Sequence, residues 1–297
     1  METTSAAAAA GTAPPVVVLG ATGGQGGAVV CALRERGVRV RAVVRDTSSR
    51  RARALAEQDI ELARADLTDA EALTAAMRDA AAAFAVTTPF EAGTDQEVAQ
   101  GEAIISAAGQ AQVPHLVLAS VASADQDTGI PHFDSKARIE ERLRSSGLEH
   151  TIVAPTYFFD NVAGEPAIAY GRLPLALPSD QSLQQVERLD LGRFVAEVMA
   201  APQHYRGRRI ELAGNAPTPA DMAATIGAAA GYLVTHVQVS LADVEARSHD
   251  LAAMFRFLAR HGYSVDIPAL QQAHPDFEWT SFATWARRHP WPDHEDT

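Results

Sequence analysis

Residues 16–26 read Val-Val-Val-Leu-Gly-Ala-Thr-Gly-Gly-Gln-Gly, an apolar run that passes directly into glycines. The run at 16–19 is apolar and mostly β-branched, as a strand buried on both faces of a parallel sheet should be. A helical pattern follows, with Val29, Val30 and Leu33 on one face. A strand, a glycine loop and a helix in this order predict a nucleotide-binding unit.

Short apolar runs and longer amphipathic runs alternate up to about residue 154. The pattern predicts strands at 16–19, 38–44, 60–63, 82–87, 116–120 and 151–154. Two of the intervening helices are expected to begin with capping boxes, at 68–71 and 94–97. Because right-handed crossovers leave few other topologies, the pattern predicts an α/β protein. We expect a Rossmann-type doubly wound parallel sheet with a smaller C-terminal α/β lobe.

The same pattern divides the chain into parts. Residues 1–15, rich in Ala and Thr, are expected to form a disordered tail. Residues 16–155 are expected to form the nucleotide-binding Rossmann domain, and 188–214, a helix and an apolar strand, to return to it. Residues 156–297 are expected to form the smaller substrate or partner lobe.

Composition excludes several classes of protein. The 297 residues carry 25 Lys and Arg against 37 Asp and Glu, a formal charge of −12, which disfavours direct binding to nucleic acid. The single cysteine, Cys31, excludes an internal disulfide and a cysteine-clustered metal site. The histidines lack ligand spacing, so no metal is expected. No apolar run approaches the roughly 18 residues that cross a bilayer, and we expect a cytoplasmic protein without membrane contact.

The glycine loop is the strongest candidate for a cofactor site. In such loops the first glycine permits a tight turn, the second lets the backbone approach a pyrophosphate, and the third lets helix and strand pack closely. The N–H groups at the start of the helix are then available to phosphates. The cofactor-binding residues expected from this loop are Gly20, Thr22, Gly23, Gly24, Gln25 and Gly26.

The end of the second strand indicates which dinucleotide is bound. An NAD site has an acidic residue about 20 residues beyond the glycines, whereas this chain has Arg45 there, with Arg50 and Arg51 close behind. Arginine cannot accept hydrogen bonds from a ribose hydroxyl, but it can bind a 2′-phosphate. The sequence therefore favours NADP(H), with a solvated arginine turn as the alternative. Asp66 is a candidate for contact with adenine, or equally a local helix cap.

Five motifs together resemble the NmrA-like group of atypical short-chain dehydrogenase/reductases, in its NADPH-sensor-like branch. They are GATGGQG at 20–26, VVR at 43–45, ADLTD at 65–69, VTTPFE at 86–91 and HFDSK at 132–136. The resemblance implies a Rossmann domain that binds NADP(H), a small C-terminal lobe and, in several members, a regulatory role. It also implies cofactor contacts from Thr87, Lys136, Pro155, Tyr157 and Phe158.

The HFDSK segment differs from the corresponding segment of catalytic short-chain dehydrogenases. Those enzymes share a Tyr-x-x-x-Lys pair. That spacing places both side chains on one face of a helix, where the ammonium assists proton transfer by the phenol. This chain keeps Lys136 but has His132 in place of the tyrosine. Histidine titrates near neutral pH and could donate a proton itself, or be structural. Ser120, after the fifth strand, is a candidate for orienting substrate, and a loop cap is the alternative.

These observations favour an NADP(H)-binding sensor or regulator that lacks the usual catalytic tyrosine. The alternative is an NADPH-dependent reductase of a small carbonyl or unsaturated metabolite that uses Lys136, His132 or both. The expected partner is accordingly a small-molecule substrate or a protein. Whether the chain is an enzyme, and whether it forms a homodimer, are left open by the sequence.

Overall fold

The computed structural model describes residues 13–295, so most of the tail expected at 1–15 lies outside the described residues. The chain divides into two compact units. The first consists of residues up to 120 with 135–154 and 191–210, and the second of residues 121–134 and 155–190 with those from 211 onward. The segment just after the fifth strand therefore belongs to the second unit.

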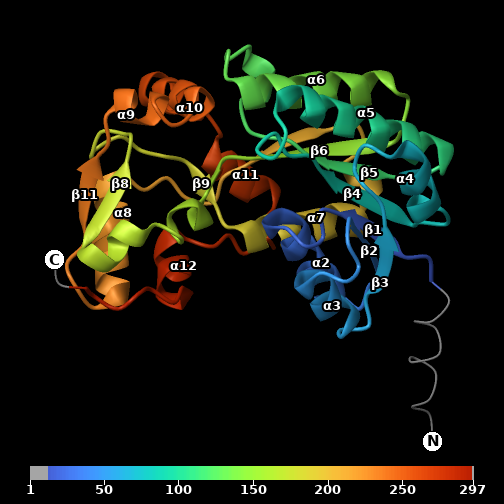
Figure 1. The fold of residues 1–297 in the computed structure, drawn as a ribbon, viewed down its shortest axis with the longest axis horizontal. Coiled ribbons are helices and arrows are strands. Elements are labelled where there is room, and N and C mark those ends of the chain that lie inside the picture. Colours follow the sequence, from blue (N-terminus) through green and yellow to red (C-terminus); the bar gives the residue numbers. More distant parts are fainter. Residues whose placement is uncertain (1–12, 296–297) are drawn as a thin grey trace, which may run out of the picture. The chain divides into compact units, whose positions relative to one another are not determined.

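A seven-stranded parallel sheet forms the core of the first unit (Figure 1), which confirms the predicted fold class. Its order is β10-β6-β5-β4-β1-β2-β3. The strands are β1 (Val16–Leu19), β2 (Val40–Val44), β3 (Glu61–Arg64), β4 (Ala82–Val86), β5 (Leu116–Ala119), β6 (His150–Pro155) and β10 (Arg209–Leu212). Every residue of β1 and β5 is buried, as their continuous apolar sequences require.

Helices cover both faces of this sheet. They are α2 (Gly24–Glu35), α3 (Arg50–Ala56), α4 (Ala70–Met77), α5 (Thr94–Gln110), α6 (Pro131–Ser145) and α7 (Arg188–Ala200), with the short 3-10 helix η4 (Pro202–His204). Figure 1 shows α4, α5 and α6 on one side of the sheet and α2, α3 and α7 on the other. Ile104, Ile139 and Ile152 belong to one buried cluster on the first of these sides.

Two helices begin differently from the predicted capping boxes, which are wrong. Helix α4 is capped by Asp69, whose carboxylate accepts from the N–H of Ala72 at 2.9 Å, while Thr68 donates to Asp66 instead. Helix α5 begins at Gly93 without a side-chain cap. Glu97, expected to close the second box, is fully buried. In the first case Thr68 has a partner in the preceding turn, and in the second Glu97 pairs with Lys136 of another helix.

The second unit contains two small parallel sheets, β7-β9 and β8-β11. Its strands are β7 (Tyr157–Phe158), β8 (Arg172–Leu175), β9 (Gln185–Val186) and β11 (Thr235–Gln238). Its helices are α8 (Pro219–Ala230), α9 (Leu241–Glu245), α10 (His249–Arg260), α11 (Ile267–Ala273) and α12 (Phe282–Arg288), with 3-10 helices η1 (Ala124–Gln126), η2 (Phe159–Val162) and η3 (Pro166–Tyr170). Phe133, Phe159 and Phe282 are fully buried in its core.

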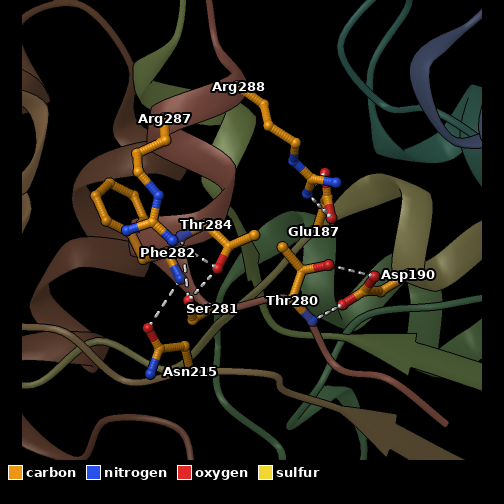
Figure 2. A network of polar contacts seen from close by, with 9 residues as sticks. All are labelled: Glu187, Asp190, Asn215, Thr280, Ser281, Phe282, Thr284, Arg287 and Arg288. Carbon is orange, nitrogen blue, oxygen red and sulfur yellow. Dashed lines mark hydrogen bonds and ion pairs between the residues drawn. The ribbon is translucent and has the colours of Figure 1, made fainter. Parts of the chain in front are cut away.

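Polar contacts fasten α12 and the segment before it to the rest of this unit (Figure 2). The buried carboxylate of Asp190 accepts from the backbone N–H of Thr280 at 2.7 Å and from its hydroxyl at 2.9 Å. Asn215 Oδ1 accepts from the N–H of Phe282 at 3.0 Å, and Arg288 pairs with Glu187 at 3.1 Å. These contacts satisfy backbone donors at the start of the helix, where no intrahelical partner exists.

None of the helices within residues 13–295 combines the length and the apolar character that a bilayer crossing needs.

The crossing of α2 over β1 depends on a glycine. A Cβ added at Gly26 would lie 2.2 Å from the carbonyl oxygen of Gly20 and 2.5 Å from its carbon, which no side chain can tolerate without moving the backbone. At the next residue, Gly27, an added Cβ would make an ordinary contact of 3.5 Å with the oxygen of Ala21. Two adjacent glycines of one helix thus differ in the space they have.

We expect Gly26→Ala to lower the free energy of unfolding by about 2 kcal/mol, the usual cost of forcing extra volume into a packed site. Gly27→Ala is the matched control, and it should leave stability unchanged or raise it by up to about 1 kcal/mol through helix propensity. Urea denaturation of both variants gives the comparison. Equal stabilities would contradict the packing role of Gly26.

Candidate functional site

The loop from Gly20 to Gly26 has the geometry of an anion-binding turn. Gly20 adopts a φ of +67°, and the N–H of Gly23 donates back to its carbonyl at 2.9 Å. Gly23 is the N-cap of α2, with no side-chain cap, and the first turn of the helix carries no acidic residue. The first N–H groups of α2 are therefore not capped by a side chain or opposed by a carboxylate of that turn, which suits a phosphate.

Two further features of the loop fit a dinucleotide. The loop has no room for a side chain at Gly20 or at Gly26. A Cβ at Gly20 would lie 2.8 Å from Val86 Cγ1, and one at Gly26 would meet the backbone of the turn. The backbone is therefore exposed for close approach at Gly23 and Gly24. The Oε1 atom of Gln25 is buried and accepts no hydrogen bond within the described residues. A bound group with a donor could satisfy this atom.

Arg45 follows β2 directly and is held by Glu91. Its Nη1 and Nη2 atoms lie 2.6 and 3.1 Å from the two carboxylate oxygens, a two-point contact, and both side chains are more than half exposed. The hydrogen bonds and charge of Glu91 raise the pKa of the guanidinium further. Of the other two arginines, Arg51 donates to the carbonyl of Thr22 in the glycine loop at 3.4 Å, while Arg50 lies exposed in the first turn of α3.

Asp66 forms a local turn. Its Oδ1 accepts from the backbone N–H of Thr68 at 2.9 Å and from its hydroxyl at 2.6 Å. These hydrogen bonds lower the pKa of Asp66, and the charge of Arg45 adds a smaller effect in the same direction. Asp66 therefore closes a turn ahead of α4 and does not cap the helix, a role that Asp69 takes; contact with adenine stays a prediction.

Lys136 lies in a buried network of the first unit. Its ammonium donates to the carbonyl and hydroxyl oxygens of Thr87, both at 2.9 Å, and is 3.0 Å from Oε1 of Glu97. Glu97 is fully buried and also accepts from the hydroxyls of Thr87 and Ser135. Three acceptors match the three protons of the ammonium, so the charge of Lys136 is both paired and saturated.

Glu97 and Ser135 were missed by the sequence reasoning. A signal for Glu97 was present, because Glu97, Gly101 and Ile104 follow at helical spacing and all three are buried. A carboxylate on the apolar face of a helix requires a cation or donors nearby.

Ser120 is committed to a second buried carboxylate. Its hydroxyl donates to Glu140, which is fully buried and also pairs with Arg209 at 2.9 Å and Arg144 at 2.6 Å. These contacts join β5 and β10 to α6. The proposed role of Ser120 in orienting substrate stays a prediction, since the hydroxyl already has a structural partner.

His132 belongs to the second unit, where it is paired with Asp250 at the start of α10. Nδ1 of the imidazole lies 2.7 Å from Oδ1 of Asp250, and both side chains are largely but not fully buried. Burial by itself would raise the pKa of Asp250, but the hydrogen bonds and charge of His132 outweigh it and lower this pKa. An ionised carboxylate only accepts hydrogen bonds, so Nδ1 of His132 is the donor in this pair.

Other ionisable groups surround this pair. Burial raises the pKa of Asp134, and the charges of Asp127 and Asp250 add to the effect. His249 lies beside Asp250 in the sequence, and its charge acts on that carboxylate from the same side of the helix start. The pair therefore lies among two further acids and one further histidine.

The remaining predicted residues also lie in the second unit. Pro155 accepts from the N–H of Ala122 at 2.9 Å, and Tyr157 packs against Phe255 with ring centres 6.4 Å apart. Burial raises the pKa of Tyr157 to about 12, against the opposing effect of a hydrogen bond with Asn161. Phe158 precedes η2. Their contact with a nicotinamide stays a prediction.

No group of three or more His, Cys, Asp and Glu side chains within residues 13–295 is arranged to hold a metal ion.

We expect Glu97→Gln to lower the free energy of unfolding by about 3 kcal/mol, because it leaves the buried ammonium of Lys136 without its counter-charge. Glu102→Gln is the control on the same helix, since Glu102 forms an exposed pair with Arg142 at 3.3 Å. It should change stability by less than about 0.5 kcal/mol. Urea denaturation compares the two, and similar losses would show that the buried pair is no more important than a surface one.

Comparisons with known proteins agree with this geometry. The NmrA-like family model matches residues 13–286. Quinone oxidoreductase 2 of Escherichia coli is 29% identical, with 76% of this chain and 78% of that protein aligned. An NAD(P)H azoreductase of Xenophilus azovorans is 26% identical, with 75% and 76% aligned.

Among solved structures, an NADPH-dependent quinone oxidoreductase from Escherichia coli complexed with NADPH superposes with a TM-score of 0.78. The two sequences are 26% identical, and the alignment covers 91% of this chain and 98% of that one. The resemblance carried by the five sequence motifs is thereby confirmed. The chain belongs to the NmrA-like family, a family of NAD(P)H-binding oxidoreductases.

Proposed function

We propose that this protein binds NADP(H) and reduces a small conjugated acceptor, of the quinone or azo class, with His132 as the proton donor. The glycine loop would hold the pyrophosphate, and Arg45 the 2′-phosphate. Support for the cofactor comes from the uncapped start of α2, the orphaned Gln25 oxygen and the NADPH complex of the quinone oxidoreductase. Support for the acceptor class comes from the two relatives, which are named as a quinone oxidoreductase and an azoreductase.

The observation that carries the reductase proposal is the His132–Asp250 pair. His132 precedes Lys136 by one turn of α6. The proton donor and the lysine of the Tyr-x-x-x-Lys pair in related dehydrogenases have the same spacing. The imidazole Nδ1 lies 2.7 Å from the carboxylate of Asp250. Here Asp250 fixes the ring and stabilises its protonated form, as the third member of a catalytic constellation does.

Bound NADPH would supply a hydride to the acceptor. The imidazolium of His132 donates the Nε2 proton to the acceptor atom that has gained electron density, so that the acceptor takes up two electrons and two hydrogens. Asp250 stays ionised throughout and acts as a positioning residue. Because the His132 side chain is not fully buried, it can recover its proton from water. Lys136, neutralised by Glu97, contributes its position rather than a proton.

We expect His132→Ala to lower kcat for NADPH-dependent reduction of a soluble quinone by about 100-fold or more, the usual contribution of a positioned general acid. The affinity for NADPH, measured by calorimetry, should stay unchanged. Asp250→Asn should cause a smaller fall in kcat, because it weakens the hydrogen bond that orients the ring. The control is His204→Ala, an exposed histidine of η4, which should behave as wild type.

Unchanged kcat in His132→Ala would contradict the proposal, as would a fall explained by weaker NADPH binding. NADPH binding without turnover of quinone or azo acceptors would favour the second candidate, a sensor of cofactor state.

The sensor is supported by a different observation. All three protons of the Lys136 ammonium are engaged by protein oxygens, so this lysine can bind a cofactor hydroxyl only by releasing Thr87 or Glu97. Such an exchange would act on α5 and α6 together. A protein partner that recognises these helices would then respond to the cofactor.

A further inference from the structure

The ion pair between Arg45 and Glu91 lies where a dinucleotide would cross the sheet of the first unit. In the strand order β4-β1-β2, β1 lies between the other two. Arg45 directly follows β2, Glu91 lies in the loop that follows β4, and the glycine loop begins at Gly20 after β1. Because these parallel strands end at one edge, the pair passes over the carboxyl end of β1. Ligands of open α/β sheets bind at this edge.

The loop that carries Glu91 is anchored on both sides, so its carboxylate is held in a defined place. The N–H of Thr88 donates to Oε1 of Gln100 at 3.2 Å, and the N–H of Gly93 donates to the carbonyl of Pro89 at 2.7 Å. The tip between these anchors is exposed, and the side chain of Glu91 is 54% exposed. Glu91 can therefore release Arg45 by rotation of its own side chain, without unfolding of the loop.

The two-point contact with Arg45 is the contact that a phosphate would make. A guanidinium binds carboxylate and phosphate with the same fork of N–H groups. The Arg45–Glu91 pair is exposed to water, where such pairs are weak and exchangeable. A phosphate dianion can therefore displace the carboxylate.

We propose that Glu91 is a specificity-determining residue that competes with the 2′-phosphate of NADP(H) for Arg45 and accepts a hydrogen bond from the 2′-hydroxyl of NAD(H). The inference rests on the proposed function, because it assumes that the dinucleotide binds at this edge. NAD sites use a carboxylate for the ribose hydroxyl, but here Arg45 directly follows β2, and the next residue, Asp46, uses Oδ1 to accept hydrogen bonds from Ser48. Glu91 brings a carboxylate to the same place from the loop after β4. It thus reduces the preference for NADP(H) that Arg45 creates.

The test is calorimetric titration of the full-length protein with NADPH, NADH, adenosine 2′,5′-bisphosphate and AMP. Glu91→Gln removes the charge and keeps the size of the side chain. We expect it to raise the affinity for NADPH and for the bisphosphate by about two- to fivefold, the range of an exposed ion pair. The affinities for NADH and AMP should stay the same or fall, so the preference for NADPH increases.

Two controls separate this effect from a general change of charge. Glu102→Gln makes the same charge change on an exposed ion pair elsewhere in the first unit and should shift none of the four affinities. In the Arg45→Ala background, Glu91→Gln should change the NADPH affinity no more than Glu102→Gln does, because the competition needs the guanidinium.

The results of these titrations distinguish failure of this inference from failure of the proposed function. Equal rises for NADPH and NADH in Glu91→Gln would overturn the inference alone, since the pair would then merely obstruct entry. Persistence of the full effect in the Arg45→Ala background would also overturn it. A wild-type protein that binds none of the four ligands would overturn the proposed function and this inference with it.

Discussion

The close contact of Gly26 with the carbonyl of Gly20 is the constraint on which the nucleotide-binding edge depends. It lets α2 start immediately after β1 and directs the first N–H groups of the helix to the carboxyl edge of the sheet. The rest of the edge is then fixed by the strand order, because β2 and β4 flank β1 and their following residues must meet above it. A side chain at Gly26 would separate helix from strand and displace these elements together.

Local sequence was sufficient for the sheet and for most helices. The β-branched run at 16–19 and the glycines at 20–26 act within a few residues, so a single sequence contains their whole cause. The two helix starts at Asp69 and Gly93 were mispredicted for different reasons. Thr68 donates to Asp66, two residues away, and Asp69 caps the helix instead, so a second local pattern prevailed there. Glu97 pairs with Lys136, a partner that only the folded chain brings near.

The cations of the site and their carboxylate partners also differ in how readily the sequence identifies them. Arg45, His132 and Lys136 were recognised as candidate site residues. Their partners Glu91, Asp250 and Glu97 were not, although Glu91 ends the VTTPFE motif, because the hydrogen-bonded pairs of Arg45 and His132 are 46 and 118 residues apart in the sequence. An acidic protein of charge −12 offers many carboxylates, and composition does not indicate which of them will face a given cation.

The three ion pairs differ in exposure, and exposure determines what each can do. In the Lys136–Glu97 pair the carboxylate is 0% exposed, so separating the charges would leave one of them unpaired in a medium of low polarity, and the pair acts as fixed structure. The side chains of the Arg45–Glu91 pair are 63% and 54% exposed. Water and added anions compete for both charges there, so Arg45 can exchange Glu91 for another anion. The His132–Asp250 pair is intermediate, at 12% and 24%. At this depth the carboxylate of Asp250 orients the ring while water still reaches the pair, which is the environment that the proposed proton transfer would need.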